Sequence, residues 1–359
     1  MKICVFLGGT SSERDVSLVS GLRISAALRS RGHDVSLVDP ATGAIDAAGE
    51  RALRESASSV KTAPPTLEAL AALSGGSSGG GMRADLATLP SVRAADVVFL
   101  ALHGGQGEDG TIQALLDMAG VRYTGSGHLA SALAMDKDLS KTLFRAAGVQ
   151  TADWVMVTEK GKEREARNGT PSPLLVSRSS QPLPDVSHLG LPVIVKPSKQ
   201  GSTVGLTVVK SADQLGPAIV EALKYDDEVM IERFVAGREF TVGILGGEAF
   251  PVGEIIPAHE IYDYECKYTP GMAREVFPAE LPAEVGAEMQ RQARIAFAAL
   301  KLGGCARIDF RMTSDFECYC LEANTLPGMT ELSLIPQGAK AAGMEFAELC
   351  ERIARLAME

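Results

Sequence analysis

The stretch that decides the predicted fold reads Arg307-Ile-Asp309-Phe-Arg-Met-Thr-Ser-Asp-Phe-Glu-Cys-Tyr-Cys-Leu-Glu322-Ala-Asn324-Thr-Leu-Pro-Gly328. Hydrophobic and charged side chains alternate over residues 306–312, which is typical of a strand with one buried face. Residues 313–315 suit a short hairpin loop, and the β-prone run that begins at Phe316 suits the returning strand. The stretch therefore predicts a β-hairpin.

Three side chains with oxygen donors gather at one end of this hairpin. Glu322 and Asn324 are two residues apart, so they lie on the same side of the returning strand, and Asp309 can reach them from the first strand. Two carboxylates and a carboxamide are hard oxygen ligands that suit Mg²⁺, which takes further ligands from water and substrate phosphates. A solvated acidic edge is the alternative. Arg307 and the run into Pro-Gly favour a site for a metal ion and a nucleotide.

The composition narrows the class of protein. A chain of 359 residues, 45% of them hydrophobic, is long enough for two or three domains with a sizeable core. The formal net charge of −10, without a basic stripe, argues against a protein that binds nucleic acid. The apolar run at residues 3–7 is too short for a signal peptide, and no run approaches the roughly 20 residues of a membrane span. We therefore expect a cytoplasmic protein without membrane insertion.

The six cysteines include no C-x-x-C pair and no matching cluster of histidines. This spacing suggests neither a zinc site nor a disulfide framework, so we expect reduced thiols. The Gly/Ser run at residues 74–81 is typical of a flexible surface loop, and residues 158–189 suit an extended surface segment. Asn168 begins an Asn-x-Thr glycosylation motif in that segment. Because the sequence shows no secretion signal, we do not interpret the motif as a glycosylation site.

The first forty residues resemble the opening of a nucleotide-binding α/β fold. An apolar strand, a turn containing Gly8 and Gly9, a helix over residues 16–28 and a second strand predict a parallel sheet. Ser12 with Asp15 predicts a capping box at the helix start. Glu13 at that start is explained by the helix dipole alone. The G-x-G-x-x-G fingerprint is absent, which disfavours a dehydrogenase-like dinucleotide protein.

Two polar, Gly-rich loops follow predicted strands. His103 comes directly after the apolar strand at residues 97–102, where α/β sheets bind ligands, and fits a ligand contact as well as a turn residue. Lys196 stands just before the small-residue loop at 198–205. Backbone N–H groups in such a loop can wrap phosphates while the lysine supplies charge, although a plain hairpin is the alternative. The position of Lys196 favours the phosphate loop.

Residues 257–274 form a long stretch without periodicity that is rich in tyrosine. Inside a compact domain such a segment is either a lid or disordered, and its aromatic content favours a lid.

These motifs, taken in order, resemble the D-alanine–D-alanine ligases of the ATP-grasp superfamily over nearly the whole chain. The resemblance rests on Gly8-Gly9-Thr-Ser-Ser-Glu13-Arg14-Asp-Val-Ser17, Ala101-Leu-His103-Gly, Tyr123-Thr-Gly-Ser-Gly127 through Met135-Asp-Lys137, Val195-Lys196-Pro-Ser with Gly201-Ser202-Thr203-Val-Gly205, Tyr262-Asp-Tyr-Glu-Cys-Lys267-Tyr268, Arg307-Ile-Asp309 and Leu321-Glu322-Ala-Asn324-Thr-Leu-Pro-Gly328-Met-Thr. The insert at 74–81 and the charged stretch near 160–170 lie outside these motifs.

The resemblance implies an α/β, three-domain ATP-grasp fold. An N-terminal Rossmann-like parallel-sheet domain would span 1–125, and two α+β domains at 126–236 and 237–359 would clasp ATP, with a lid at 257–275. It also implies a homodimer and a reaction. Two D-alanine molecules would be ligated with ATP to D-alanyl-D-alanine, through an acyl phosphate, for peptidoglycan precursor synthesis.

The resemblance further assigns roles to single residues. Two Mg²⁺ ions, for which Mn²⁺ can substitute, would lie on Asp309, Glu322 and Asn324. The implied ATP-binding residues are Lys137, Lys196, Ser202, Thr203, Glu232, Glu239 and Lys267. The implied substrate-binding residues are Glu13, His103, Arg307 and Ser333. The implied catalytic residues are Glu13, Ser202, Tyr268, Arg307 and Gly328.

Three alternatives stay open at this point. One is a D-alanine–D-lactate ligase or another ATP-grasp carboxylate–amine ligase, and Tyr268 favours the dipeptide-forming type because it resembles that form of the lid. A second is a catalytically inactive nucleotide-binding scaffold, which the presence of every implied metal ligand and of Arg307 disfavours. The third, a dehydrogenase, lacks its fingerprint.

Overall fold

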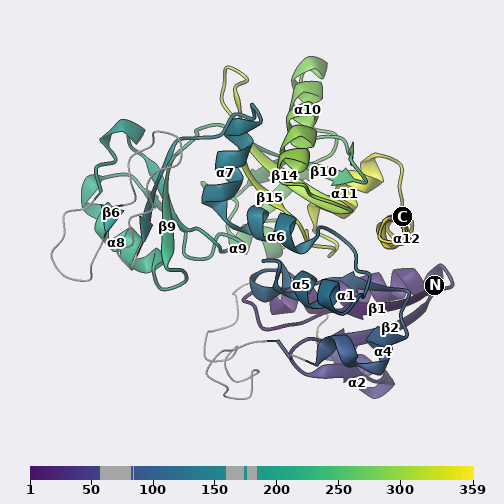
Figure 1. The fold of residues 1–359 in the computed structure, drawn as a ribbon. Helices are drawn as coiled ribbons and strands as arrows, with labels where there is room; N and C mark the ends of the chain where they lie inside the picture. The colour runs from purple at the N-terminus through teal and green to yellow at the C-terminus, as the bar shows by residue number, and fades with distance from the viewer. Residues whose placement is uncertain (57–81, 84, 159–173, 176–183) are drawn as a thin grey trace.

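The computed structural model describes residues 1–56, 82–83, 85–158, 174–175 and 184–359, with only the backbone considered at 174–175 (Figure 1). The predicted Gly/Ser loop at 74–81 lies outside the described residues. So does most of the predicted surface segment after residue 158, including Asn168.

The N-terminal sheet contains three parallel strands and one antiparallel edge strand. Its order is β3-β2-β1-β4, in which β1 pairs in parallel with β2 and β4. The strands are β1 (Lys2–Phe6), β2 (Asp34–Asp39), β3 (Gly43–Ile45) and β4 (Val97–Leu100). The helices around them are α1 (Arg14–Ser30), α2 (Ala47–Ser56), α4 (Pro90–Arg93) and α5 (Thr111–Met118). The predicted opening of the fold is confirmed.

The turn between β1 and α1 shows how this opening is held. Gly8 has φ +88°, and a Cβ on it would fall 2.8 Å from the Asp39 carboxylate, so only glycine fits. The predicted capping box is wrong, because the N-cap is Glu13 and no side chain caps the helix. Ser11 instead donates to the His103 carbonyl at 2.5 Å and accepts from the Glu13 N–H at 3.2 Å. The Ser11 hydroxyl thus joins the loop before α1 to the loop that begins at His103.

The second sheet is a separate layer with its own core. Its order is β6-β5-β9-β7-β8, and α8 (Ala212–Ala222) packs against β7 and β8. The strands are β5 (Trp154–Thr158), β6 (Leu174–Leu175), β7 (Val193–Pro197), β8 (Thr207–Val209) and β9 (Glu228–Arg233). β7 and β8 pair antiparallel on either side of the loop that follows Lys196, and the binding of phosphate by that loop stays a prediction.

The third sheet contains the predicted hairpin within residues 307–328. Its order is β13-β12-β10-β14-β15, with β11 beside β10. The strands are β10 (Arg238–Leu245), β11 (Glu248–Ala249), β12 (Gly253–Pro257), β13 (Ala273–Val276), β14 (Cys305–Met312) and β15 (Cys318–Asn324). The predicted hairpin is confirmed, although its loop runs over 313–317 and is longer than expected. The register places Asp309 opposite Glu322 and Arg307 opposite Asn324.

The predicted lid at 257–275 contains regular structure, so its description as an unpatterned loop is wrong. The short helix α9 (Tyr264–Tyr268) begins where the Asp263 carboxylate accepts a hydrogen bond from the Cys266 N–H at 2.9 Å. Its last residues belong to β13, which pairs with β12. The side-chain cap of α9 and the pairing of β13 with β12 leave no hydrophobic periodicity in the sequence.

Four helices cover the third sheet: α6 (His128–Met135), α7 (Lys137–Ala146), α10 (Ala283–Ala299) and α11 (Leu334–Ala341). α6 and α7 pack against β15, and α7 also packs against α10 (Figure 1). The Asp136 side chain caps α7 by accepting from the Leu139 N–H at 3.0 Å. This cap fixes Lys137 at the first position of the helix.

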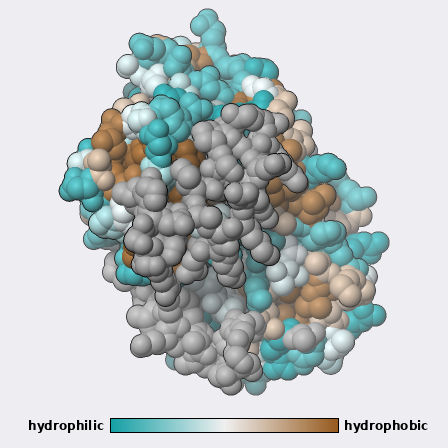
Figure 2. Space-filling view, turned by 60° about the vertical axis from the view of Figure 1, so that its left-hand side comes forward, coloured by the Kyte–Doolittle hydropathy of each residue, from teal (hydrophilic) through white to brown (hydrophobic). Residues whose placement is uncertain are grey.

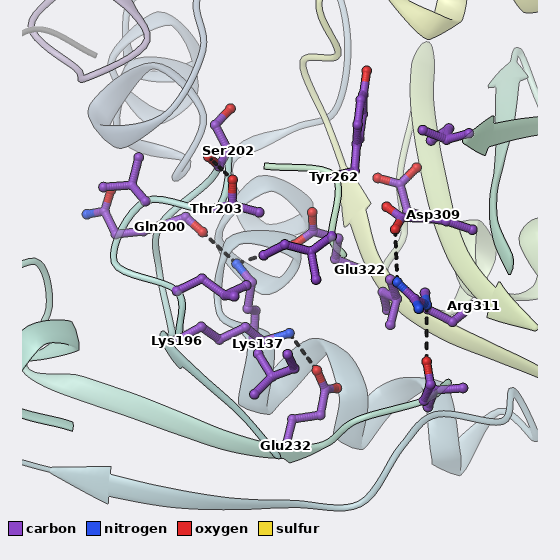
Figure 3. A pocket seen from close by; sticks show the side chains of 18 of the residues that line it. Lys137, Lys196, Gln200, Ser202, Thr203, Glu232, Tyr262, Asp309, Arg311 and Glu322 are labelled. Atoms are coloured by element: carbon purple, nitrogen blue, oxygen red, sulfur yellow. Dashed lines mark hydrogen bonds and ion pairs between the residues drawn. The ribbon is translucent and has the colours of Figure 1, made fainter. Parts of the chain in front are cut away.

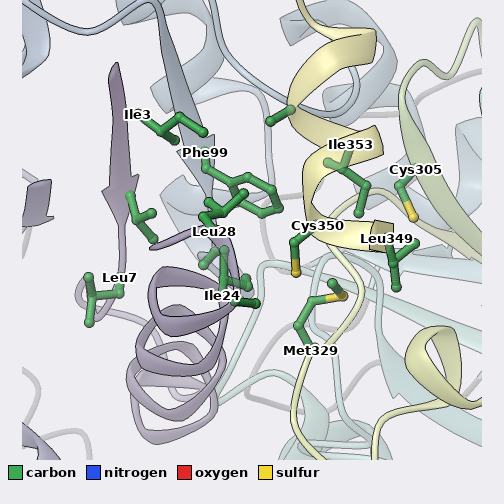
Figure 4. Close-up of a cluster of buried hydrophobic side chains, with 14 of the residues drawn as sticks. Ile3, Leu7, Ile24, Leu28, Phe99, Cys305, Met329, Leu349, Cys350 and Ile353 are labelled. Atoms are coloured by element: carbon green, nitrogen blue, oxygen red, sulfur yellow. The ribbon is translucent and has the colours of Figure 1, made fainter. Parts of the chain in front are cut away.

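The last helix, α12 (Phe346–Leu356), returns to the N-terminal part of the chain. Leu349, Cys350 and Ile353 share one apolar cluster with residues of α1, β1 and β4 (Figure 4). An ion pair between Arg31 and Glu351, 2.6 Å long, borders this contact. Each sheet lies within one of the predicted domains, whereas α12 packs across them, and the domain limits stay a prediction.

Figure 2 shows one face of the molecule, on which hydrophilic side chains interrupt the hydrophobic ones across the described residues. The described part of the chain contains no helix with the length and hydropathy needed to cross a membrane. The apolar side chains are concentrated instead in the clusters between the layers.

Candidate active site

A pocket open to solvent lies between the second and third sheets (Figure 3). Its polar lining comes from β7, β9 and the loop after β7 on one side, from β10, β14 and β15 on the other, and from α7 and α9. The predicted site residues that line it are Lys137, Lys196, Ser202, Thr203, Glu232, Glu239, Lys267, Arg307, Asp309 and Glu322. Pockets with a few convergent polar groups are typical of sites for small molecules.

Part of the pocket lining is apolar. Phe234 and Val235, which follow β9, line it together with Ile194 and Leu321. A slot of this kind suits a flat ring. Beside it, Glu239 pairs with Arg311 at 3.3 Å, and burial raises the pKa of Glu239 despite that cation.

The loop after β7 has a conformation that is rare outside glycine. Ser202 and Thr203 have φ values of +50° and +59°, in the left-handed region. Such backbone strain persists only where the surroundings impose it, and it concentrates at functional sites. The ammonium of Lys137 supports this loop by donating to the Gln200 carbonyl at 2.7 Å, and it lies 3.4 Å from the Glu322 carboxylate (Figure 3).

Glu232 is buried between two lysines. Lys196 Nζ donates to Oε2 of Glu232 at 2.7 Å, and Lys141 Nζ donates to Oε1. Burial by itself would raise the pKa of Glu232, but the two ammonium groups outweigh it and lower the pKa to about 2. The carboxylate is therefore ionised at neutral pH.

The structure brings together the three residues that were predicted to bind metal, Asp309, Glu322 and Asn324. Asp309 accepts from the Thr241 hydroxyl at 2.7 Å, the Arg307 guanidinium at 2.9 Å and the Asn324 amide at 3.0 Å. Partial burial would raise the pKa of Glu322, but the surrounding lysines, Lys137 first among them, lower it to about 2. Two ionised or hydrogen-bonded carboxylates with a neighbouring amide oxygen fit the ligand chemistry of Mg²⁺.

A chain of hydroxyl groups joins the pocket to the N-terminal sheet. Ser202 Oγ donates to the Glu13 carboxylate and lies 3.4 Å from Tyr268 Oη. Glu13 is only 8% exposed, and Tyr268 comes from the lid helix α9. The structure thus brings together three residues that the resemblance linked, from three distant parts of the chain.

The remaining predicted residues lie beside the pocket rather than in its lining. Gly328 approaches Ser333 so closely that a Cβ on it would fall 2.7 Å from Ser333 Oγ. Ser333 stands at the start of α11 and accepts from the Thr330 N–H at 2.9 Å. His103 Nδ1 donates to the Leu326 carbonyl at 2.8 Å, and burial lowers the pKa of His103, which favours the neutral ring.

Comparisons with known proteins agree with this site. The family model described as "D-ala D-ala ligase N-terminus" matches residues 2–126, and the one described as "D-ala D-ala ligase C-terminus" matches residues 143–355. The chain belongs to the D-alanine–D-alanine ligase family. A D-alanine–D-alanine ligase of Geotalea uraniireducens is 38% identical over 98% of this chain and 94% of that protein. One of Geobacter sulfurreducens is 39% identical over 98% and 92%, respectively.

Solved structures of this ligase family support the fold. The crystal structure of D-alanine–D-alanine ligase from Bacillus anthracis complexed with ATP matches with a TM-score of 0.72 at 28% identity. The match covers 100% of this chain and 97% of that one. A second structure of the same ligase, with no ligand in its description, matches with a TM-score of 0.71 at 29% identity over the same shares of both chains. The predicted ATP-grasp fold is confirmed.

Sequence reasoning missed several residues around this ligase site. Thr241 orients Asp309, and Lys141 holds the far oxygen of Glu232. Ser20 accepts from the Met329 N–H at 3.1 Å and lies 3.3 Å from His103 Nε2. These contacts join strands and helices far apart in the sequence, so no local pattern marks them.

Glu108 was within reach of the sequence argument. It lies in the Gly-rich loop that begins at His103, a position that fits a ligand contact as well as a turn. Its carboxylate accepts from the N–H groups of Gly104, Thr325 and Leu326 at 3.0, 3.2 and 3.1 Å. Glu108 therefore joins the N-terminal loop to the segment that leads into Gly328.

Proposed function

We propose that this chain ligates two D-alanine molecules to D-alanyl-D-alanine with ATP, through an acyl-phosphate intermediate, for peptidoglycan precursor synthesis. One observation carries the proposal. The pocket brings Lys137, Lys196 and Lys267 to face the carboxylates of the β14–β15 hairpin, and the Ser202–Glu13 hydrogen bond connects it to the start of α1. The relatives that are D-alanine–D-alanine ligases and match over nearly their whole length support the same reaction.

ATP is assigned to the pocket between the second and third sheets. The apolar slot beside Phe234 would take the adenine ring, with Glu232 at the adenine and Glu239 at the ribose hydroxyls. The β7–β8 loop with Ser202 and Thr203 would wrap the phosphates. Lys137, Lys196 and Lys267 would neutralise the phosphate charge, as phosphoryl transfer requires. The relative from Bacillus anthracis was solved in complex with ATP, which supports this assignment.

Asp309, Glu322 and Asn324 are assigned as ligands of two Mg²⁺ ions, with Mn²⁺ as a substitute. The bound ions would neutralise charge on the phosphates during phosphoryl transfer. Thr241 and Arg307 orient Asp309 by hydrogen bonds, so the carboxylate has a fixed position. Lys137 lies near Glu322 and can hold the same phosphate region.

The substrates are assigned to the side of the pocket that faces the N-terminal sheet. Glu13 would hold the ammonium of the first D-alanine near His103, and Ser333 would hold the carboxylate of the second. The carboxylate of the first substrate would attack the γ-phosphate and displace ADP, which gives the acyl phosphate. The neutral amine of the second D-alanine would then attack the acyl carbon, lose a proton and expel inorganic phosphate. Arg307 and the Gly328 N–H would donate to the oxyanion, where loss of one donor costs roughly 3–4 kcal/mol.

Closure of the lid over this site has a chemical purpose. An acyl phosphate is hydrolysed by water, so a site that forms one must exclude solvent. The contact of Ser202 with Glu13, and its approach to Tyr268, places the lid helix against the N-terminal sheet. Tyr268 is the lid residue of the dipeptide-forming type, which supports a D-alanine amine as the second substrate.

We also propose domain limits at 1–125, 126–236 and 237–359, a homodimer, and a cytoplasmic location. The position of one sheet in each range supports the domain limits. The dimer and the location rest on family membership, and light scattering of the purified protein tests the dimer directly.

The experiment that tests the function is ADP release with ATP, Mg²⁺ and D-alanine, with the products identified by mass. L-alanine and a mixture of D-alanine with D-lactate are run in parallel. D-alanine-dependent ADP release with dipeptide formation is the expected result. Turnover with another carboxylate but none with D-alanine would overturn the substrate assignment, and formation of D-alanyl-D-lactate in preference to the dipeptide would indicate the depsipeptide-forming type.

A further inference from the structure

Lys141 is a lysine with no access to solvent and no place in the mechanism above. Its side chain is 0% exposed, and its ammonium donates to Oε1 of Glu232 and, at 2.6 Å, to the Thr151 hydroxyl. Burying an ammonium is costly unless it is paired and hydrogen-bonded. A methionine or leucine would fill such a position without that cost, so the charge of Lys141 requires an explanation.

The explanation lies in the partner that Lys141 shares. Lys196 occupies the second oxygen of the same Glu232 carboxylate at 2.7 Å and lines the pocket, whereas Lys141 lies behind Glu232 on α7. The three groups together carry two positive charges and one negative charge. Without Lys141, the carboxylate would be left to Lys196 alone, and that pair would be neutral.

We propose that Lys141 is a positioning residue for nucleotide binding: it compensates the charge of Glu232 from behind, so that Lys196 presents a net positive charge to the phosphates. The inference rests on the proposed function, since it needs an anionic nucleotide in the pocket. It assigns Lys141 no contact with the nucleotide.

The surroundings of Lys141 fit this role. Thr151 accepts from Lys141 and donates its own proton to the Cys320 carbonyl of β15 at 2.7 Å, so the ammonium is fixed to the third sheet. The Trp154 ring lies 5.0 Å from Nζ and offers its face to the cation. Burial lowers the pKa of Lys141, and Glu232 opposes that shift.

The test measures the Kd for ATP in the absence of D-alanine, by calorimetry at fixed Mg²⁺ and salt. Lys141→Met removes the charge and keeps the length of the side chain. We expect the Kd to rise about tenfold, because one unit charge is lost from a site that binds an anion at close range. A steady-state assay should place the same change in KM for ATP, with a smaller change in kcat.

A second background distinguishes this role from simple structural support. In Glu232→Gln, Lys141 loses the anion that keeps its buried ammonium charged. Adding Lys141→Met to that background therefore removes no charge and should change the Kd for ATP by about twofold or less. An equal fold-change in both backgrounds would overturn the proposal. So would an unchanged Kd in a Lys141→Met protein that melts as a folded protein.

Two further variants serve as a replacement and as a control. Lys141→Gln is neutral but can still donate to Glu232, and it replaces the methionine variant if that protein does not fold; the same loss of affinity is expected. Lys224→Met, an exposed lysine paired with Glu221 on the same layer, should leave the Kd unchanged. Wild-type protein that fails to bind ATP would count against the proposed function, whereas wild-type binding with no effect of Lys141→Met or Lys141→Gln would count against this inference alone.

Discussion

The two walls of the pocket differ in the sign of the charge that each leaves uncompensated. On the wall formed by the second sheet, Lys141 and Lys196 share the single carboxylate of Glu232. On the wall formed by the third sheet, strands β10, β14 and β15 bring three carboxylates (Glu239, Asp309 and Glu322) together with two guanidiniums (Arg307 and Arg311). Lys137 of α7 approaches Glu322 at 3.4 Å from outside that sheet. Counted over its own strands, the third sheet therefore has a surplus anion, whereas the other wall has a surplus cation.

Some charged groups away from the pocket are matched one to one. Arg14 pairs with Asp39 and Arg238 pairs with Glu254. Such pairs need no ligand. Opposite surpluses on facing walls instead fit a ligand that carries both signs, which is what a nucleotide polyphosphate with its metal ions provides. We therefore expect the bound nucleotide and its metal ions to complete the charge balance of the site.

Removal of the surplus anion at Glu322 should have the largest effect on activity. Glu322→Gln should lower kcat/KM by about 100-fold or more, because metal ions supply several kcal/mol of charge stabilisation in phosphoryl transfer. The measurement is ADP release over a range of Mg²⁺ concentrations, where the variant should need far more Mg²⁺. Asp315→Asn, exposed in the loop of the same hairpin, is the control and should behave as wild type. An unchanged Mg²⁺ dependence in Glu322→Gln would remove Glu322 from the metal site.

Glu108 is a partly buried glutamate outside both walls, and its charge is balanced differently. Glu108 has backbone N–H partners and makes no ion pair with the described residues, and burial followed by the nearby Glu13 charge raises its pKa to about 7 despite the opposing charge of Arg307. A raised pKa means that the folded state binds the proton more tightly than the unfolded state. The resulting stabilisation is present below the ordinary pKa of 4.5 and is lost as the pH rises through about 7.

This predicts a pH-dependent difference between wild type and Glu108→Gln. From pH 5 to pH 8, the free energy of unfolding of wild type should fall relative to the variant by about 1–2 kcal/mol, which allows for the partial exposure of this side chain. Urea unfolding at both pH values measures it, with exposed Glu284→Gln as the control. Parallel pH profiles for wild type and Glu108→Gln would show that the carboxyl does not titrate in this range.

The smallest expected effect concerns the lid that closes over both walls. Tyr268→Phe removes a hydroxyl that lies 3.4 Å from Ser202 Oγ, so kcat should fall about fivefold, the worth of roughly one hydrogen bond. Tyr264→Phe is the matched control, because its ring packs edge-on against Tyr268 with centroids 4.7 Å apart. Among the described residues its buried hydroxyl has no hydrogen-bond partner. Equal losses in both variants would assign the effect to ring packing instead.

Much of the fold could be predicted because it depends on local pattern. Alternation located β14, an apolar run located β4, and the turn with Gly8 marked the step from β1 to α1. The lid was less predictable, since α9 depends on one side-chain cap by Asp263 and β13 depends on pairing with β12. Neither device has a hydrophobic period.

The site was predictable where a motif carries its ligands in sequence. Glu322 and Asn324 are separated by one residue, and Lys196 precedes its loop directly. Lys141 and Thr241 were not predictable, because their roles come from partners on other strands. A lysine on an amphipathic helix is normally solvated, and nothing near Lys141 in the sequence announces Glu232.

The contact of α12 with α1 has a consequence for how this protein is made. The apolar face of α1, which includes Ile24 and Leu28, is covered by residues from the opposite end of the chain, such as Ile353. During synthesis that face stays uncovered until residues 346–356 have left the ribosome, so the packing of α1 is completed late. Contacts this distant in sequence slow folding and lengthen the time during which an aggregation-prone surface is exposed. A chain shortened before α12 would therefore leave the apolar face of α1 exposed.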